Sequence, residues 1–210
     1  MRETLTVLAG LLVLTLVAAL IGPGFVDWRA YRPQIEARLG AALGVETAVA
    51  GGIELRLLPS PRLTLADVRI GPAGVAASSV AIEKLEAELA LGPLARGEVR
   101  LSDVQAEGAT LSVVLDEAGG VLLPARIGAG LPAQTSLDRL SLRRSAVIWR
   151  EPGKEPVTFS PVSAEMSAVG LAGPWRIEGE VDGASLRIST GALEPQGRLR
   201  AKATLTGEEP

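Results

Sequence analysis

The 210-residue chain carries 21 basic and 24 acidic side chains and contains neither histidine nor cysteine. These absences exclude Ser-His-Asp and Cys-His catalysis, zinc sites of the usual His/Cys type, and disulfides. The net charge of −3 and the lack of a basic block argue against nucleic acid as a partner.

An uncharged, almost wholly apolar run extends from Leu5 to Ile21. As a helix it would be about 26 Å long, at the short end of what crosses the roughly 30 Å apolar core of a bilayer. A cleaved signal peptide is the alternative, with Val17-Ala18-Ala19 as its cleavage site. Because the run continues through Ile21 and no polar segment precedes that site, we expect a retained single transmembrane anchor over residues 1–24.

Charges on both sides of this run leave its orientation open. Arg2 marks one side as cytoplasmic under the positive-inside rule, whereas Arg29 and Arg32 follow closely on the other side. Large domains cross membranes largely regardless of charge, so charge counting alone does not settle the orientation.

Residues 25–44 predict a juxtamembrane amphipathic helix. Its apolar residues recur at three- and four-residue steps and share one face. Pro33 suits a first-turn position, so the helix proper is expected to start near Arg32 and to stop at Gly44. The helix either packs on the following domain or lies at the membrane surface. The candidates for membrane-interface contact are Trp28, Tyr31, Ile35 and Leu39.

From residue 45 the hydrophobic period changes to two, as in Ile53, Leu55 and Leu57, which alternate with charged residues. This pattern predicts a mainly β fold: a curved antiparallel sheet that is apolar on one face and charged on the other. We expect one β segment over residues 45–116 and a second over 136–210. Residues 117–135, rich in Gly, Ala and Pro, predict a long loop between them.

A weak internal repeat accompanies the strands. The segment Leu65–Arg69 recurs as Leu101–Gln105 and more loosely as Leu137–Ser141, each copy 36 residues after the previous one. Repeats at such spacing indicate supersecondary units that stack on one another, because no unit buries its apolar face alone.

Carboxylate pairs such as Asp116/Glu117 and Glu151/Glu155 lie on expected turns, and Glu86/Glu88 lies on a polar strand face. A solvated surface explains them better than the paired acids of a glycosidase. The lysines lack a nearby serine motif, and Gly128-Ala129-Gly130 does not continue into a phosphate-binding fingerprint. We therefore expect no enzyme, no cofactor and no metal.

The predicted apolar face is aliphatic and has few helices available to cover it. It is either an ordinary covered core or a groove that holds acyl chains, since exposed apolar patches generally mark a binding partner. The positions expected to line such a groove are Ile53, Leu55, Leu57, Leu63, Leu65, Leu85, Leu89, Leu91, Val99, Leu101, Leu111, Val113 and Leu115.

Several segments together resemble the N-terminal part of the AsmA family of bacterial envelope proteins, which include bridge-like lipid-transfer proteins. They are FVDWRAYRPQIE (Phe25–Glu36), the strand segment IELRLLPSPRLTLADVRIG (Ile53–Gly71), LEAELALGPLARGEVRLSDV (Leu85–Val104) and GLAGPWRIEGEVDG (Gly170–Gly183). The similarity rests on the order of these segments after a short anchor, and no catalytic signature is among them.

The resemblance implies an inner-membrane anchor, a body in the periplasm of a Gram-negative bacterium and a β-rich, taco-like groove. It also implies a role in outer-membrane assembly or in phospholipid movement between membranes. Family members are usually several times longer. About a dozen strands would give a groove on the order of 55 Å, so we expect a fragment, a truncated relative or a membrane-proximal piece that hands lipid onward.

Two functions follow as expectations. The first is a membrane-anchored, non-enzymatic module that binds or transfers phospholipid. The second is an anchored scaffold that binds envelope proteins through its sheet edge and apolar face.

Overall fold

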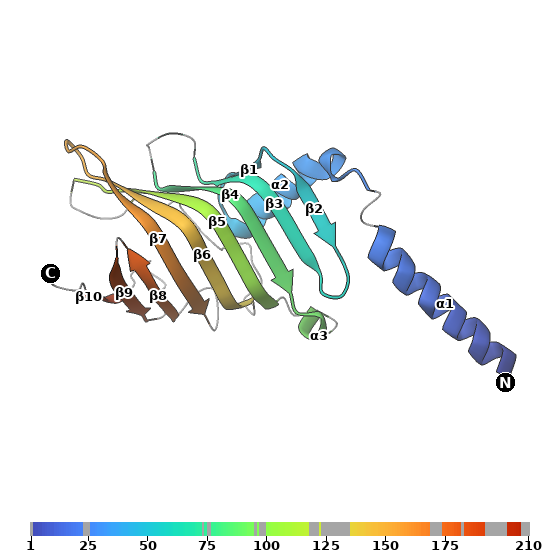
Figure 1. Ribbon diagram of the computed structural model, residues 1–210. Coiled ribbons are helices and arrows are strands. Elements are labelled where there is room, and N and C mark those ends of the chain that lie inside the picture. Colours follow the sequence, from blue (N-terminus) through green and yellow to red (C-terminus); the bar gives the residue numbers. More distant parts are fainter. Residues whose placement is uncertain are drawn as a thin grey trace.

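The computed structural model describes residues 2–22, 26–72, 74, 77–94, 96, 100–117, 122, 135–168, 174–181, 183–191 and 201–206. These residues form one ten-stranded sheet with a few helices, which confirms the mainly β prediction (Figure 1). The helices are α1 (Arg2–Ile21), the 3-10 helix η2 (Trp28–Tyr31), α2 (Arg32–Leu43) and α3 (Leu91–Leu94). The strands are β1 (Thr47–Val49), β2 (Ile53–Arg56), β3 (Arg62–Ile70), β4 (Ser79–Leu89), β5 (Arg100–Val114), β6 (Ser136–Arg150), β7 (Val157–Ala168), β8 (Trp175–Val181), β9 (Ala184–Thr190) and β10 (Ala201–Thr206).

The strands lie in the order β1-β3-β4-β5-β6-β7-β8-β9-β10, and β2 also pairs with β3. β1 and β2 are two halves of one edge strand, because both pair with β3 on either side of the break at residues 50–52. Figure 1 shows an open sheet, with α2 on one face and α1 directed away from it.

Two features of the sheet differ from the sequence-based prediction. The described sheet is open rather than curled into a taco-like groove. The prediction of purely antiparallel pairing was also wrong, because β5 and β6 are parallel. Their register joins Leu101 to Leu137 and Val104 to Leu140, so two copies of the 36-residue repeat lie side by side. A parallel pair needs a long connection, and the loop predicted over 117–135, which supplies it, lies largely outside the described residues.

Helix α2 begins and ends where the sequence predicts. Pro33 occupies the first turn, and Gly44 closes the helix with φ 72°, a left-handed conformation that glycine adopts without strain. The backbone N–H of Gly44 donates to the carbonyl oxygen of Gly40 at 2.8 Å. The side chains of Ile35 and Leu39, together with Trp28, pack against the buried core of the sheet. That core consists of Val49, Ile53, Leu65, Val68, Ile82, Ala106 and Ala109.

A line of left-handed residues crosses the sheet. Asp67 in β3, Gly108 in β5 and Arg144 in β6 have φ values of 52°, 64° and 49°. Glu83 of β4 lies at the same level between Asp67 and Gly108, because the pairs on either side of it stay in register, but its own backbone is not left-handed. Each left-handed residue shifts the side-chain alternation by one position. Leu65 and Val68 are therefore both buried on one face, although strict alternation would separate them.

Helix α1 covers the apolar N-terminal run, and its described large side chains are exposed, for example Leu8 at 71% and Leu14 at 68%. Over the part of the chain that the structure describes, no helix combines the length and apolar character required to cross a bilayer.

The break between β1 and β2 requires a glycine at position 51. A Cβ atom there would lie 2.7 Å from both the Cβ and the carbonyl oxygen of Ala66, whereas a Cβ at Gly52 would meet no atom within 4 Å. We expect Gly51→Ala to lower the free energy of unfolding by about 1–3 kcal/mol, because the strand must shift. Gly52→Ala is the matched control. Denaturant unfolding of both variants checks this, and equal stabilities would contradict it.

Candidate functional site

Cross-strand pairing assembles one continuous apolar face. One row of partners runs through β3 to β9 as Leu63, Ala87, Val104, Leu140, Met166, Ile177 and Ile188. The neighbouring row is Leu65, Leu85, Ala106, Leu142, Ala164, Gly179 and Leu186. The apolar face therefore extends from the N-terminal edge of the sheet almost to the opposite edge, across strands of both predicted β segments.

The part of this face nearest β1 is a closed core. Helix α2 lies over it, Ile53 and Leu65 are buried, and Leu63 and Leu85 pack against the same cluster. Leu65 is 1% exposed, so water does not reach it. These four predicted groove positions are brought together by the fold, but they pack beneath a helix rather than lining an open surface.

The part of the face on β6 to β9 is open. No described residue of β8 or β9 is buried: the side chains of the polar face are exposed, and those of the apolar face are half-buried. We define the open apolar face by six half-buried residues, Leu140, Ala164, Met166, Ile177, Leu186 and Ile188. This surface is the candidate functional site.

None of these six residues is among the groove positions predicted from the sequence. The signal was present, since Ile177 and Val181 alternate with Glu178 and Glu180, but the proposed positions stopped at Leu115. The helix that covers the first strands is what divides closed core from open surface, and alternation alone does not reveal which strands a helix covers.

The remaining predicted positions are dispersed. Leu89 pairs with Leu101 at the strand ends, and Leu55 pairs with Leu63. Leu111 and Val113 face Val80 and Trp149 on neighbouring strands.

Four others lie off the sheet rows. Leu115 is buried just beyond β5, where its backbone N–H donates to the carbonyl of Arg150 at 3.0 Å. Leu57 follows β2 and is exposed, and Leu91 is exposed in α3 because β4 ends at Leu89. Val99 lies outside the described residues.

The predicted membrane-interface residues divide in a similar way. Trp28, Ile35 and Leu39 pack against the sheet core, as the packed-helix alternative predicts. Tyr31 is 47% exposed, and its ring centroid lies 6.0 Å from that of Trp28.

The opposite face of the sheet is polar, and its charges pair across strands. Arg62 contacts Glu88 of the neighbouring strand at 2.6 Å, and Arg187 contacts Glu178 of the neighbouring strand at 3.3 Å. Hydrogen bonds from Ser60 and Arg62 hold the pKa of Glu88 below its ordinary value. Within the described ranges, no group of three or more acidic side chains is placed to hold a metal ion. This face is therefore suited to contact with water.

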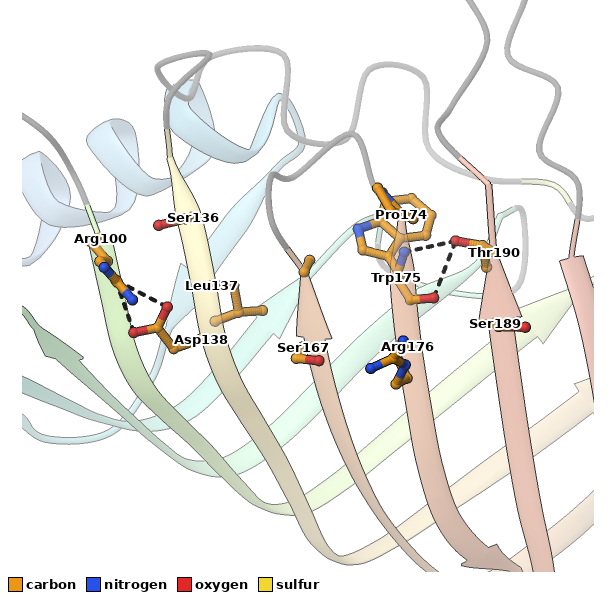
Figure 2. A pocket seen from close by; sticks show the side chains of 11 residues that line it. Arg100, Ser136, Leu137, Asp138, Ser167, Pro174, Trp175, Arg176, Ser189 and Thr190 are labelled. Atoms are coloured by element: carbon orange, nitrogen blue, oxygen red, sulfur yellow. Dashed lines mark hydrogen bonds and ion pairs between the residues drawn. The ribbon is translucent and has the colours of Figure 1, made fainter.

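A pocket of about 570 Å³, lined by both polar and apolar side chains, lies at the sheet rim, where β5, β6 and β8 begin and β7 and β9 end (Figure 2). Arg100 contacts Asp138 at 2.9 Å, and this hydrogen-bonded pair raises the pKa of the arginine. The backbone N–H of Trp175 donates to Oγ1 of Thr190 at 2.9 Å. Asp138 is the one carboxylate among the described residues that line the pocket, and Arg100 already engages it.

Comparison with known proteins gives one match. The family model described as the AsmA family matches residues 1–142. No curated protein and no solved structure matches the chain. The matched part runs from α1 into β6, so β7 to β10 lie beyond it, and with them five of the six residues that define the open apolar face.

Because one part of the apolar face is closed and the other is open, shortening a side chain to alanine is expected to destabilise the protein by different amounts in the two parts. Leu65→Ala is expected to lower the free energy of unfolding by about 3 kcal/mol, because it leaves a cavity in a packed core. Ile188→Ala on the open apolar face is expected to cost about 1 kcal/mol or less, since its side chain remains partly in water in the folded state. Denaturant unfolding of the full chain in mild detergent measures both. Equal losses would contradict an open face on β9.

Proposed function

The chain belongs to the AsmA family, and from this premise we propose that it is an envelope protein that binds phospholipid on its open apolar face. In this proposal the protein acts without catalysis and moves lipid during outer-membrane biogenesis. The observation that carries the proposal is a continuous apolar face, covered by α2 at one end and left half-exposed on β6 to β9.

The chemistry of the open apolar face suits acyl chains. Its residues are aliphatic or thioether side chains, which pack against flexible hydrocarbon without demanding a fixed ring geometry. Each methylene group removed from water contributes about 0.8 kcal/mol. The surface from β6 to β9 spans three interstrand spacings, about 14 Å. A chain lying across these strands would therefore bury many methylene groups, while the headgroup stays in water.

We further propose that α1 anchors the protein in the inner membrane, with the sheet in the periplasm. Two observations support an anchor: the run from Leu5 to Ile21 has no charge, and the described large side chains of α1 are exposed. Exposed apolar side chains along a whole helix need an apolar environment. The resemblance to envelope proteins favours the periplasmic side for the sheet.

A second candidate function is an anchored scaffold. The observation that favours it is the position of β10, the last strand of the described sheet, which pairs with β9 along one edge. An edge strand is able to accept a strand from another protein by β-augmentation. This function does not require an open apolar face, so the following experiment separates the two.

The lipid proposal predicts a face-specific effect in β7. Met166→Asp places a charge on the open apolar face and is expected to reduce co-purified phospholipid at least tenfold, because acyl chains do not solvate a carboxylate. Ser167→Asp is the matched control, since Ser167 is adjacent and exposed on the polar face. Lipid per protein is measured by mass spectrometry after mild-detergent purification, with circular dichroism to verify folding. Equal lipid content in both folded variants would contradict the proposal and favour the scaffold.

The anchor proposal predicts that charges within α1 release the protein from membranes. The double variant Leu8→Arg, Leu14→Arg is expected to shift the protein from the membrane fraction to the soluble one. Each arginine near a helix centre costs about 2.5–3.5 kcal/mol of insertion free energy. Leu8→Ala, Leu14→Ala is the control and should remain resistant to alkaline extraction. Retention of the arginine variant in the membrane would argue against α1 as an anchor.

A further inference from the structure

Two arginines stand at the junction between α1 and the sheet. Arg29 lies in η2 and Arg32 begins α2, eight and eleven residues after the end of α1 at Ile21. Both line a hollow of about 570 Å³ together with Pro33, Ala50, Gly51 and Gly52. These are the charges that leave the membrane orientation open in the sequence, and the lipid-binding face on β6 to β9 does not use them.

No carboxylate among the described residues forms an ion pair with either arginine. The acidic side chains close to them in sequence are engaged by backbone groups. The backbone N–H of Arg29 donates to the carboxylate of Asp27 at 3.1 Å, and that of Val49 donates to Glu36 at 2.7 Å. The described lining of the hollow contains no acidic residue, so the hollow carries positive charge.

The guanidinium of Arg32 is only partly satisfied. Its Nη2 donates to the carbonyl oxygen of Gly51 at 2.8 Å, whereas its Nε is buried and has no hydrogen-bond partner. An unpaired buried donor is costly, so the hydrogen-bonding capacity of this guanidinium is not fully used by the described residues. The planar guanidinium group matches the oxygens of a phosphate or carboxylate with paired donors.

The hollow also leaves room for an anion. Its far wall is the break between β1 and β2, which is built from Ala50, Gly51 and Gly52. The backbone N–H groups of Ala50 and Gly51 donate to carbonyls of β3, which fixes this wall. At Gly52 no atom lies within 4 Å of the Cβ position, so the space beside it is open.

We propose that Arg29 and Arg32 bind the phosphate group of a lipid headgroup at the foot of α1. This site rests on the proposed anchor, which would hold the hollow next to the membrane surface. The rings of Trp28 and Tyr31 lie in the same short segment, and such rings favour the headgroup region of a bilayer. Headgroup binding also accounts for two arginines on the side of the apolar run opposite to Arg2.

The test compares two lipids that share acyl chains and differ in the phosphate. The full chain is equilibrated in mild-detergent micelles with equal amounts of phosphatidylglycerol and diacylglycerol, separated by gel filtration and analysed by mass spectrometry. The wild-type protein is expected to retain more phosphatidylglycerol. Arg29→Gln should lower the ratio of the two retained lipids about tenfold, since a charge-assisted contact is lost. Arg29→Lys should keep most of the preference.

Arg38→Gln is the matched control, because Arg38 is exposed on α2 and does not line the hollow. Arg32→Gln is a second variant, and its thermal unfolding is measured alongside because Arg32 also holds Gly51. Equal retention of the two lipids by the wild-type protein would overturn the proposal. The proposal would also be overturned if both the Arg29→Gln variant and a folded Arg32→Gln variant kept the preference for phosphatidylglycerol.

Two further arms separate the headgroup site from a free-phosphate site and from the open apolar face. Inorganic phosphate is titrated into the wild-type protein and Arg29→Gln by calorimetry. Arginine-dependent binding of phosphate without any lipid preference would overturn the lipid assignment. Met166→Asp is expected to lower retention of both lipids while the remaining bound lipid keeps its phosphate preference. If Met166→Asp leaves total lipid unchanged while Arg29→Gln abolishes the preference, the open apolar face fails and the headgroup site stands.

Discussion

The packed core beneath α2 depends on the line of left-handed residues through β3, β5 and β6. In a strand with strict two-residue alternation, apolar residues that are three positions apart lie on opposite faces of the sheet. The left-handed conformations at Asp67, Gly108 and Arg144 allow the phase to change once, at the same level in neighbouring strands. Leu65 and Val68, and likewise Ala106 and Ala109, therefore lie on the same face. Without this coordinated shift, the apolar residues on one side of the line would turn to the charged face, and the core beneath α2 would not form. The open apolar face lies wholly on one side of the line and does not depend on the shift.

Function in this account arises from incomplete coverage of one face. Helix α2 lies over the first strands, where Ile35 and Leu39 complete a packed core. Beyond it the same rows of side chains continue as the open apolar face, while the opposite face forms ion pairs across strands. An aliphatic surface beside a hydrated one is suited to an acyl chain with its headgroup in water. The covered end lies next to α1, and the open end lies on the strands furthest from it (Figure 1). The open apolar face therefore lies at the end of the sheet away from α1, and the end next to α1 is closed by α2.

Much of this fold follows from local sequence patterns, and the rest depends on long-range pairing. The bounds of α2 were predictable because Pro33 and Gly44 fix its ends through backbone conformation alone. The β-rich body and its two-faced character were predictable from alternation, and the family from the order of segments. The parallel pairing of β5 and β6 was not predictable, because no local signal distinguishes a parallel neighbour from an antiparallel one. The 36-residue repeat nevertheless has the same offset as the register of this pair. The candidate site was only partly predictable. Leu65 and Ile188 have the same alternating context, and only the position of α2 makes one of them core and the other surface.

The central claim is that lipid contacts one face of β8 and β9 and avoids the other. Cells that produce the full chain would be fed a photoactivatable fatty acid and irradiated. Peptide mass spectrometry would then identify the residues of the protein that carry lipid adducts. The account predicts adducts at Ile177, Leu186 and Ile188, with few or none at the intervening Glu178 and Arg187 on the polar face. Adducts distributed equally over both faces, or confined to α1, would contradict a lipid-binding role for the open apolar face.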